Sequence, residues 1–234
     1  MNWKDIKVSK DTTHFLYEEN KIFDNYFIEV LKFHAPGLAP VLNQSGAFHI
    51  DSNGNDLYEE RYDRTFGFYC NRAAVIKDDK WFHIDEKGKK VYETTYLWSG
   101  NYQENVCTVR DLHNNYFHID LNGNRCYKEN YKYAGDFKDG IACVKSQNGY
   151  YKHIYEHGKC INNKEYIYLG IFHKNYATAK DEKGWFHIDK LGLQLYQERY
   201  ELIEPFYNGF ALVTLENNKK QIINEEGKVV LKLG

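Results

Sequence analysis

Short apolar stretches alternate with polar turn signals along the chain, and the alternation has a fixed period. The string Phe-His-Ile-Asp begins at Phe48, Phe82, Phe117 and Phe186, and degenerate copies occupy residues 152–155 and 221–224. Self-similarity at a constant step of about 35 residues is typical of repeat architectures. The sequence therefore predicts six copies of one structural repeat, near residues 27–58, 59–92, 93–127, 128–162, 163–196 and 197–233.

Two further series keep the same step. A small residue precedes each string by about ten positions, at Ala39, Ala73, Cys107, Ala142, Ala177 and Ala211. A glycine follows each string, at Gly54, Gly88, Gly123, Gly158, Gly192 and Gly227. Apolar stretches of this length, bounded by turn residues, indicate strands, and only residues 1–10 show any hint of a helical period. Each repeat is therefore predicted to be a three-stranded antiparallel meander, with a short fourth strand left open.

The aspartate at the end of each string has a predicted role in the turn that follows. An Asp at the first turn position accepts backbone hydrogen bonds, and a Gly at the fourth position adopts positive φ without steric cost. This interpretation makes the recurring aspartates structural: Asp51, Asp85, Asp120 and Asp189.

A meander of this size cannot bury its apolar face alone, so adjacent repeats must cover one another. The pattern stops within a repeat at Leu233, and the N-terminal residues Phe27, Phe33 and 38–41 match the parts that the last repeat lacks. The chain is therefore predicted to be a single all-β domain over residues 1–234, closed into a β-propeller-like ring in which the N-terminal strand completes the last repeat. An open β-solenoid is the alternative.

Charge and composition narrow the functional classes. Because 31 Lys and Arg face 33 Asp and Glu, the chain has no basic field for nucleic acid. No apolar run fits a signal peptide or a membrane span, so we expect a cytoplasmic location and no membrane partner. Five cysteines without a Cys-x-x-Cys pair argue against a disulfide framework and a thiolate zinc site. We expect no cofactor.

Two stretches show the repeat pattern most fully, residues 137–142 and 184–192. The pattern begins with an aromatic residue, a glycine, a small residue and a valine, and continues with Trp-x-x-Ile-Asp, a glycine turn and a tyrosine. This pattern resembles the bacterial WG repeat (KWG repeat) family, over about residues 27–231. The chain has Phe82 and Phe186 where the family has the glycine of Trp-Gly, and Tyr116 and Tyr151 stand at the tryptophan position of other copies, so it resembles a divergent subgroup of the family. The resemblance implies an interaction module, often attached to enzymatic domains, without catalytic residues of its own.

The repeated His-x-Asp places a histidine and an aspartate on the same face of each strand, because alternate residues share a face. Histidines and carboxylates together can bind a metal. We instead interpret the histidines as structural, since each aspartate is needed in its turn and a buried imidazole requires a hydrogen-bond partner in the neighbouring repeat. These histidines are His49, His83, His118 and His187, and no metal site is predicted.

Residues that break the repeat are the candidates for binding, since packing of the repeat does not require them. They are Trp98, Arg110, His113, His157, His173 and Tyr207. No nucleophile-elbow, zinc-protease, P-loop or dinucleotide motif is present in the sequence. The predicted function is a non-catalytic scaffold that binds another protein or an attached domain. The alternative is a lectin-like module that stacks glycan on aromatic side chains, and a glycosidase-type propeller enzyme is third.

Overall fold

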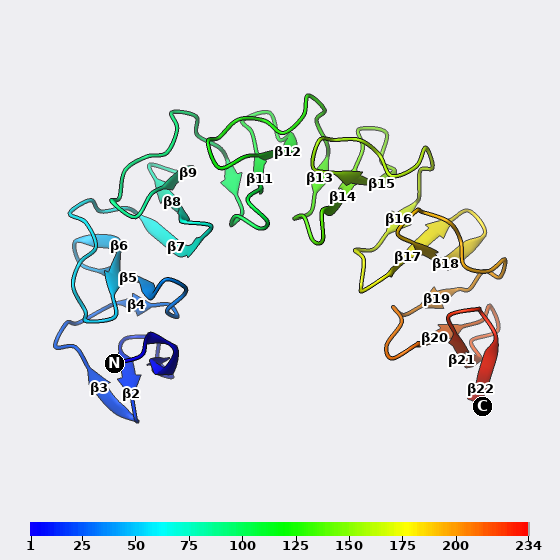
Figure 1. Ribbon diagram of the computed structural model, residues 1–234, viewed down its shortest axis with the longest axis horizontal. Helices are drawn as coiled ribbons and strands as arrows, with labels where there is room; N and C mark the ends of the chain where they lie inside the picture. Colours follow the sequence, from blue (N-terminus) through cyan, green and yellow to red (C-terminus); the bar gives the residue numbers. More distant parts are fainter. Residues whose placement is uncertain (234) are drawn as a thin grey trace. The chain divides into compact units, whose positions relative to one another are not determined.

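The computed structural model describes residues 1–233, and Figure 1 shows its strands along the chain. The chain divides into two compact units, Met1–Arg125 and Cys126–Gly234, which are described separately below. In both units the sheets are antiparallel meanders of consecutive strands, which confirms the predicted all-β class and the three-stranded repeat. Within residues 1–233, no helix has the length and apolar character needed to span a membrane.

The first compact unit holds the sheets β1-β2-β3, β4-β5-β6, β7-β8-β9 and β10-β11-β12, preceded by a 3-10 helix at Trp3–Asp5. Its strands are β1 (Lys7–Val8), β2 (Phe15–Tyr17), β3 (Asn20–Ile22), β4 (Glu29–Val30), β5 (Leu38–Asn43), β6 (Gly46–Asp51), β7 (Arg64–Tyr69), β8 (Arg72–Lys77), β9 (Lys80–Ile84), β10 (Trp98–Ser99), β11 (Cys107–Arg110) and β12 (Tyr116–Ile119).

The second compact unit holds the sheets β13-β14-β15, β16-β17-β18 and the four-stranded β19-β20-β21-β22. Its strands are β13 (Tyr133–Ala134), β14 (Ile141–Lys145), β15 (Tyr151–Tyr155), β16 (Tyr168–Leu169), β17 (Tyr176–Asp181), β18 (Gly184–Asp189), β19 (Leu202–Ile203), β20 (Phe210–Thr214), β21 (Lys220–Asn224) and β22 (Val229–Leu233).

The turn after each Phe-His-Ile-Asp string has the geometry that the sequence predicts. Asp51 Oδ1 accepts hydrogen bonds from the backbone N–H groups of Asn53 (2.8 Å) and Asn55 (2.9 Å). Gly54 adopts a φ of +86° and donates its N–H to the Asp51 carbonyl at 3.0 Å. Asp85, Asp120 and Asp189 accept the same pair of backbone bonds in their own turns. The carboxylate of each of these aspartates therefore finds its hydrogen-bond donors within its own turn.

Five of the six turn glycines pack against an aromatic ring that precedes them by about 30 residues, and Gly192 instead packs against Asn162. An ideal Cβ at Gly88 would lie 2.5 Å from Tyr58 Cγ, and one at Gly123 would lie 2.4 Å from Tyr92 Cδ1. The Tyr62 hydroxyl also donates to the Gly88 carbonyl at 2.6 Å. Glycine is needed at these turns both for the positive φ and for the close approach of the ring.

The small residues of the first strand series are buried in all six repeats. Ala177 is 1% exposed and lies opposite Ile188 in the β17-β18 ladder. Replacing Ala177 by leucine should lower the free energy of unfolding by about 1 to 3 kcal/mol, because a close-packed strand has no room for added methylenes. Urea unfolding measures the change, and Ala177→Ser serves as the tolerated control. Equal stability of the leucine variant and the parent would show that this seam is loosely packed.

The last repeat is complete within its own compact unit, which corrects the prediction that an N-terminal strand completes it. After the turn at Gly227, β22 continues to Leu233 and pairs with β21 as a fourth strand. In earlier repeats the chain after the turn pairs with the preceding strand only through isolated bridges, such as Ile84 to Lys90 and Trp81 to Tyr96. The fourth position is therefore filled by the chain that directly follows the turn.

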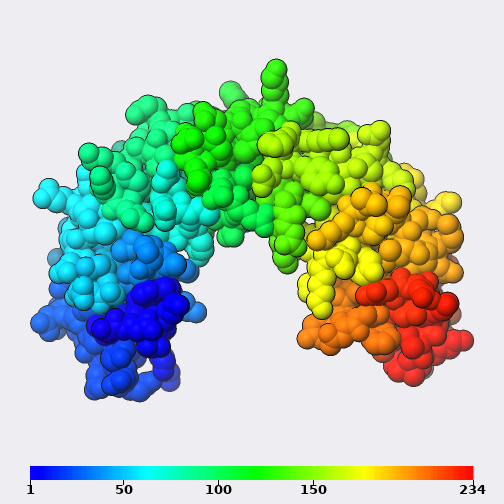
Figure 2. All heavy atoms as spheres, viewed as in Figure 1, coloured from blue at the N-terminus to red at the C-terminus, as the bar shows by residue number. Residues whose placement is uncertain are grey.

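The N-terminal residues form a sheet of their own, β1-β2-β3, in place of the helical period that residues 1–10 suggest. Phe15 of β2 is buried in the apolar core of the first compact unit, with its ring centroid 4.9 Å from that of Phe33. Phe23 packs on Gly54, in the place that tyrosine takes in later repeats. In the space-filling view these residues, in dark blue, lie against the blue atoms of the following sheet (Figure 2). This sheet covers the first of the six repeats.

Candidate binding site

Three repeats carry a row of one aromatic, one cationic and one aromatic side chain across their three strands. In each row the three residues lie directly opposite one another in the strand register, so their side chains share a face. We call these sets the aromatic-cation rows: Trp98, Arg110 and Tyr116 in the first compact unit, then Tyr133, Lys145 and Tyr151, and Tyr168, Lys180 and Trp185, in the second.

The backbone brings the two rows of the second compact unit side by side. Tyr151 and Tyr166 exchange a pair of backbone hydrogen bonds, at 2.8 and 3.0 Å. Because alternate residues share a face, this pair places Tyr168 on the same face, next to Tyr151. Their ring centroids are 5.5 Å apart, and Tyr168 lies 5.1 Å from Trp185 in its own row. The result is a continuous set of aromatic rings from one repeat to the next.

Each row holds its cation close to an aromatic ring. Lys145 Nζ lies 5.0 Å from the centroid of Tyr151, and Lys180 Nζ lies 5.5 Å from that of Trp185. In the first compact unit, Arg110 Cζ lies 5.8 Å from the centroid of Tyr116, and its Nε is buried without a hydrogen-bond partner among the described residues. Cations at this distance are attracted by the ring quadrupole, which fixes them near the aromatic surface.

A pocket of about 420 Å³ lies within the second compact unit, where its two rows meet. Its wall is formed mainly by the rings of Tyr133, Tyr151 and Tyr168, with Ile171 and Pro205 beside them. Tyr133 is 47% exposed and Tyr168 is 46% exposed, so solvent reaches their faces. A volume in this range accommodates a small ligand or one large side chain.

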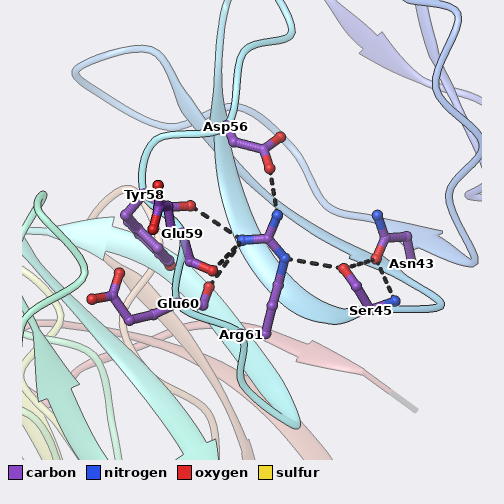
Figure 3. A network of polar contacts seen from close by, with 7 residues as sticks. All are labelled: Asn43, Ser45, Asp56, Tyr58, Glu59, Glu60 and Arg61. Atoms are coloured by element: carbon purple, nitrogen blue, oxygen red, sulfur yellow. Dashed lines mark hydrogen bonds and ion pairs between the residues drawn. The ribbon is translucent and has the colours of Figure 1, made fainter.

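Arginines outside the rows are held by the protein itself. The Arg61 guanidinium lies 3.8 Å from the ring centroid of Phe48 and forms an ion pair with Asp56. It also donates to the backbone carbonyls of Tyr58, Glu59 and Glu60 and to the Ser45 hydroxyl (Figure 3). Arg199 stacks on Phe186 in the same way and pairs with Asp181. These two arginines bind the loop after the glycine turn, and each guanidinium already forms an ion pair with an aspartate of the chain.

The recurring histidines are buried and bond to the following repeat. A carbonyl oxygen can only accept, so His49 Nε2 donates to the Phe66 carbonyl (2.7 Å) and Nδ1 accepts from the Tyr58 hydroxyl. His187 has the equivalent bonds to the Glu204 carbonyl (2.9 Å) and the Tyr196 hydroxyl (2.6 Å). These bonds connect each repeat to the next.

Burial lowers the pKa of these imidazoles from the ordinary value of 6.5. The pKa falls to about 4 for His49, His83, His153 and His187 because the charged form loses its hydration, and a bond to a backbone carbonyl offsets only part of this effect. The four imidazoles are therefore neutral at neutral pH. Over residues 1–233, no three His, Cys, Asp or Glu side chains are grouped so that they could hold a metal ion.

The structure places the six predicted binding residues in different surroundings. It brings Trp98 and Arg110 together in one row. The other four are exposed and lie outside the rows, and a binding role for them stays a prediction: His113, His157, His173 and Tyr207.

Sequence reasoning missed the tyrosines and lysines of the second compact unit. Their signal is a step of 35 residues from Trp98 to Tyr133 to Tyr168, matched by the same step from Arg110 to Lys145. A recurring tyrosine is readily assigned to the core, and only the strand register shows that these rings flank a cation.

Comparison with known families and structures agrees with this repeat architecture. The family model described as "WG containing repeat" matches residues 50–81, 130–151 and 188–219, which supports a WG repeat assignment for these regions. No curated protein matches the chain in sequence. The chain is thus an all-β repeat protein built from antiparallel meanders, and regions in both compact units match the WG repeat model.

Solved structures resemble the chain in fold at low sequence identity. A crystal structure titled as the eukaryotic initiation factor has a TM-score of 0.54 at 11% identity, over 91% of this chain and 66% of that chain. BamB from Moraxella catarrhalis has a TM-score of 0.47 at 12% identity, over 94% and 76%. The WD40 β-propeller domain of Doa1 has a TM-score of 0.35 at 12% identity, over 88% and 85%. The first likeness concerns the fold alone, and the other two are too weak to carry an argument.

Proposed function

We propose that this chain is a non-catalytic scaffold that binds a partner protein through its aromatic-cation rows. The observation that carries the proposal is the recurrence in three repeats of one arrangement whose side chains are partly or fully exposed. Repeat proteins present such surfaces along adjacent repeats, and tryptophan, tyrosine and arginine side chains dominate the binding energy of protein interfaces. The WG-type repeats support the same proposal, because such modules generally serve in interactions.

The test compares a row variant with a matched control. The row variant is Tyr133→Ala with Tyr168→Ala, and the control is Tyr26→Ala with Tyr155→Ala, which removes two exposed tyrosines outside the rows and outside the predicted binding residues. A protein captured by the parent chain is identified, purified and titrated against all three forms by calorimetry. We expect the row variant to lose about tenfold or more in affinity, since a truncated hot-spot tyrosine costs about 1 to 2 kcal/mol. The control should bind like the parent.

A loss of binding in the control alone would contradict the proposal, because it would assign the interface to Tyr26 or Tyr155. The exposed rings of Tyr133 and Tyr168 also favour a second candidate, a lectin-like function, since sugars stack on aromatic faces. Binding to a glycan array that disappears in the row variant, with no protein partner captured, would support this second function against the first.

A further inference from the structure

Lys145 and Lys180 are cations without a carboxylate partner in the described part of the second compact unit. Some other cations of this unit form ion pairs, such as Lys152 with Glu165, Lys190 with Asp139 and Arg199 with Asp181. Lys145 and Lys180 are instead partly buried, and each approaches an aromatic ring, Tyr151 or Trp185. An ammonium group that is half-buried beside a ring and has no internal counterion attracts an anionic ligand group.

The lining of the pocket between these rows indicates which uncharged group of the ligand it can bind. Tyrosine rings together with Leu169, Ile171 and Pro205 form most of its surface, and Thr178 is the one side-chain hydroxyl outside the tyrosines. A sugar needs several strong hydrogen-bonding side chains to satisfy its hydroxyl groups, and the described residues that line this pocket include no carboxylate, carboxamide or guanidinium group. An apolar side chain needs none. The pocket therefore favours a leucine-like or aromatic side chain of a polypeptide over a glycan ring.

We propose that the second compact unit binds an extended acidic segment of a partner protein. Carboxylates of this segment contact Lys145 and Lys180, and an apolar side chain between them occupies the pocket lined by Tyr133, Tyr151 and Tyr168. The ligand is extended because the two lysines belong to rows in adjacent repeats, and tyrosines of both rows line the pocket. This inference rests on the proposed function and adds the chemical class of the partner.

The test uses the full chain and a fluorescein-labelled random copolymer of Glu and Tyr, which contains many spacings of carboxylate and ring. Binding is followed by fluorescence anisotropy. We expect saturable binding that weakens about tenfold or more in Lys145→Gln with Lys180→Gln, and weakens again as salt rises from about 50 to about 500 mM. The matched control is Lys159→Gln with Lys219→Gln, which removes the same charge at exposed positions outside the rows and should bind like the parent.

Three results would overturn the inference. One is that a Lys-Tyr copolymer binds the parent chain as tightly as the Glu-Tyr copolymer does. Another is that the control variant loses as much affinity as the Lys145→Gln, Lys180→Gln variant. The third is equal binding of polygalacturonate, an acidic glycan, with the same dependence on the two lysines. A captured partner protein that needs Tyr133 and Tyr168 but tolerates the double lysine variant would overturn the acidic chemistry and leave the proposed function standing. Failure of the tyrosine variant to affect any partner would instead refute the proposed function.

Discussion

Acidification from pH 7 to about pH 5 should unfold the chain, because its buried histidines resist protonation. For each imidazole whose pKa falls from 6.5 to about 4, the unfolded state binds more protons between these two values. Stability from this source is therefore fully present above pH 6.5 and is lost as the pH falls toward 4. At pH 5 the loss is about 2 kcal/mol for each histidine, or about 8 kcal/mol for the four, if they act independently. The total free energy of unfolding of a folded domain is about 5 to 15 kcal/mol, so the loss at pH 5 is comparable with the whole stability of the fold.

Circular dichroism during urea unfolding at several pH values measures this effect. The slope of the unfolding free energy against pH gives the number of protons taken up, which should approach four near pH 5. The variant His83→Gln should be less stable at pH 7 and should take up one proton fewer. A flat pH profile between 7 and 5 would show that the buried imidazoles are not neutral in the folded chain.

The second large effect is expected for Gly158→Ala. Gly158 has a φ of +77°, and its added Cβ would lie 2.7 Å from Tyr127 Cβ. The variant should lose about 2 to 5 kcal/mol of unfolding free energy, of which about 1 to 2 come from the left-handed backbone and the rest from overlap with the ring. The matched control is Gly140→Ala, whose φ is +73° and whose Cβ would meet nothing within 4 Å.

Thermal and urea unfolding of the two glycine variants separate the two causes. Gly140→Ala should show the backbone contribution alone, so the difference between the variants reports the contact between the turn and Tyr127. If both variants lost the same amount, the turn would not be pressed against the ring, and the repeats would be joined mainly by their apolar strands.

The parts of this fold that follow local rules could be predicted from sequence. The period, the three strands and the turn after Phe-His-Ile-Asp all depend on residues within one repeat, such as Asp51 and Gly54. The sheet β1-β2-β3 could not, because it breaks those rules: Glu18 and Glu19 adopt positive φ, at 48° and 64°, without any glycine. Its role is visible only in three dimensions, where Phe23 takes the place of a tyrosine.

The candidate site was only partly predictable, for a different reason. Trp98 and Arg110 stand out because they break the repeat, and they do lie in one row. Tyr133 and Tyr168 recur with the period and therefore resemble core residues in the sequence. Their proposed role depends on which strand neighbour faces them, and that neighbour, Lys145 or Lys180, is fixed by strand register. Composition carries no information about register.

The contacts between repeats are short in sequence as well as in space. The bond from His49 to the Phe66 carbonyl spans 17 residues, and that from Tyr62 to the Gly88 carbonyl spans 26. Chains whose contacts are this local have a low contact order, and low contact order favours rapid folding. Within each compact unit, a repeat that has formed offers its tyrosine ring and carbonyl as a template for the next. Folding can therefore start at any repeat and extend along the chain in both directions, without a search for distant partners.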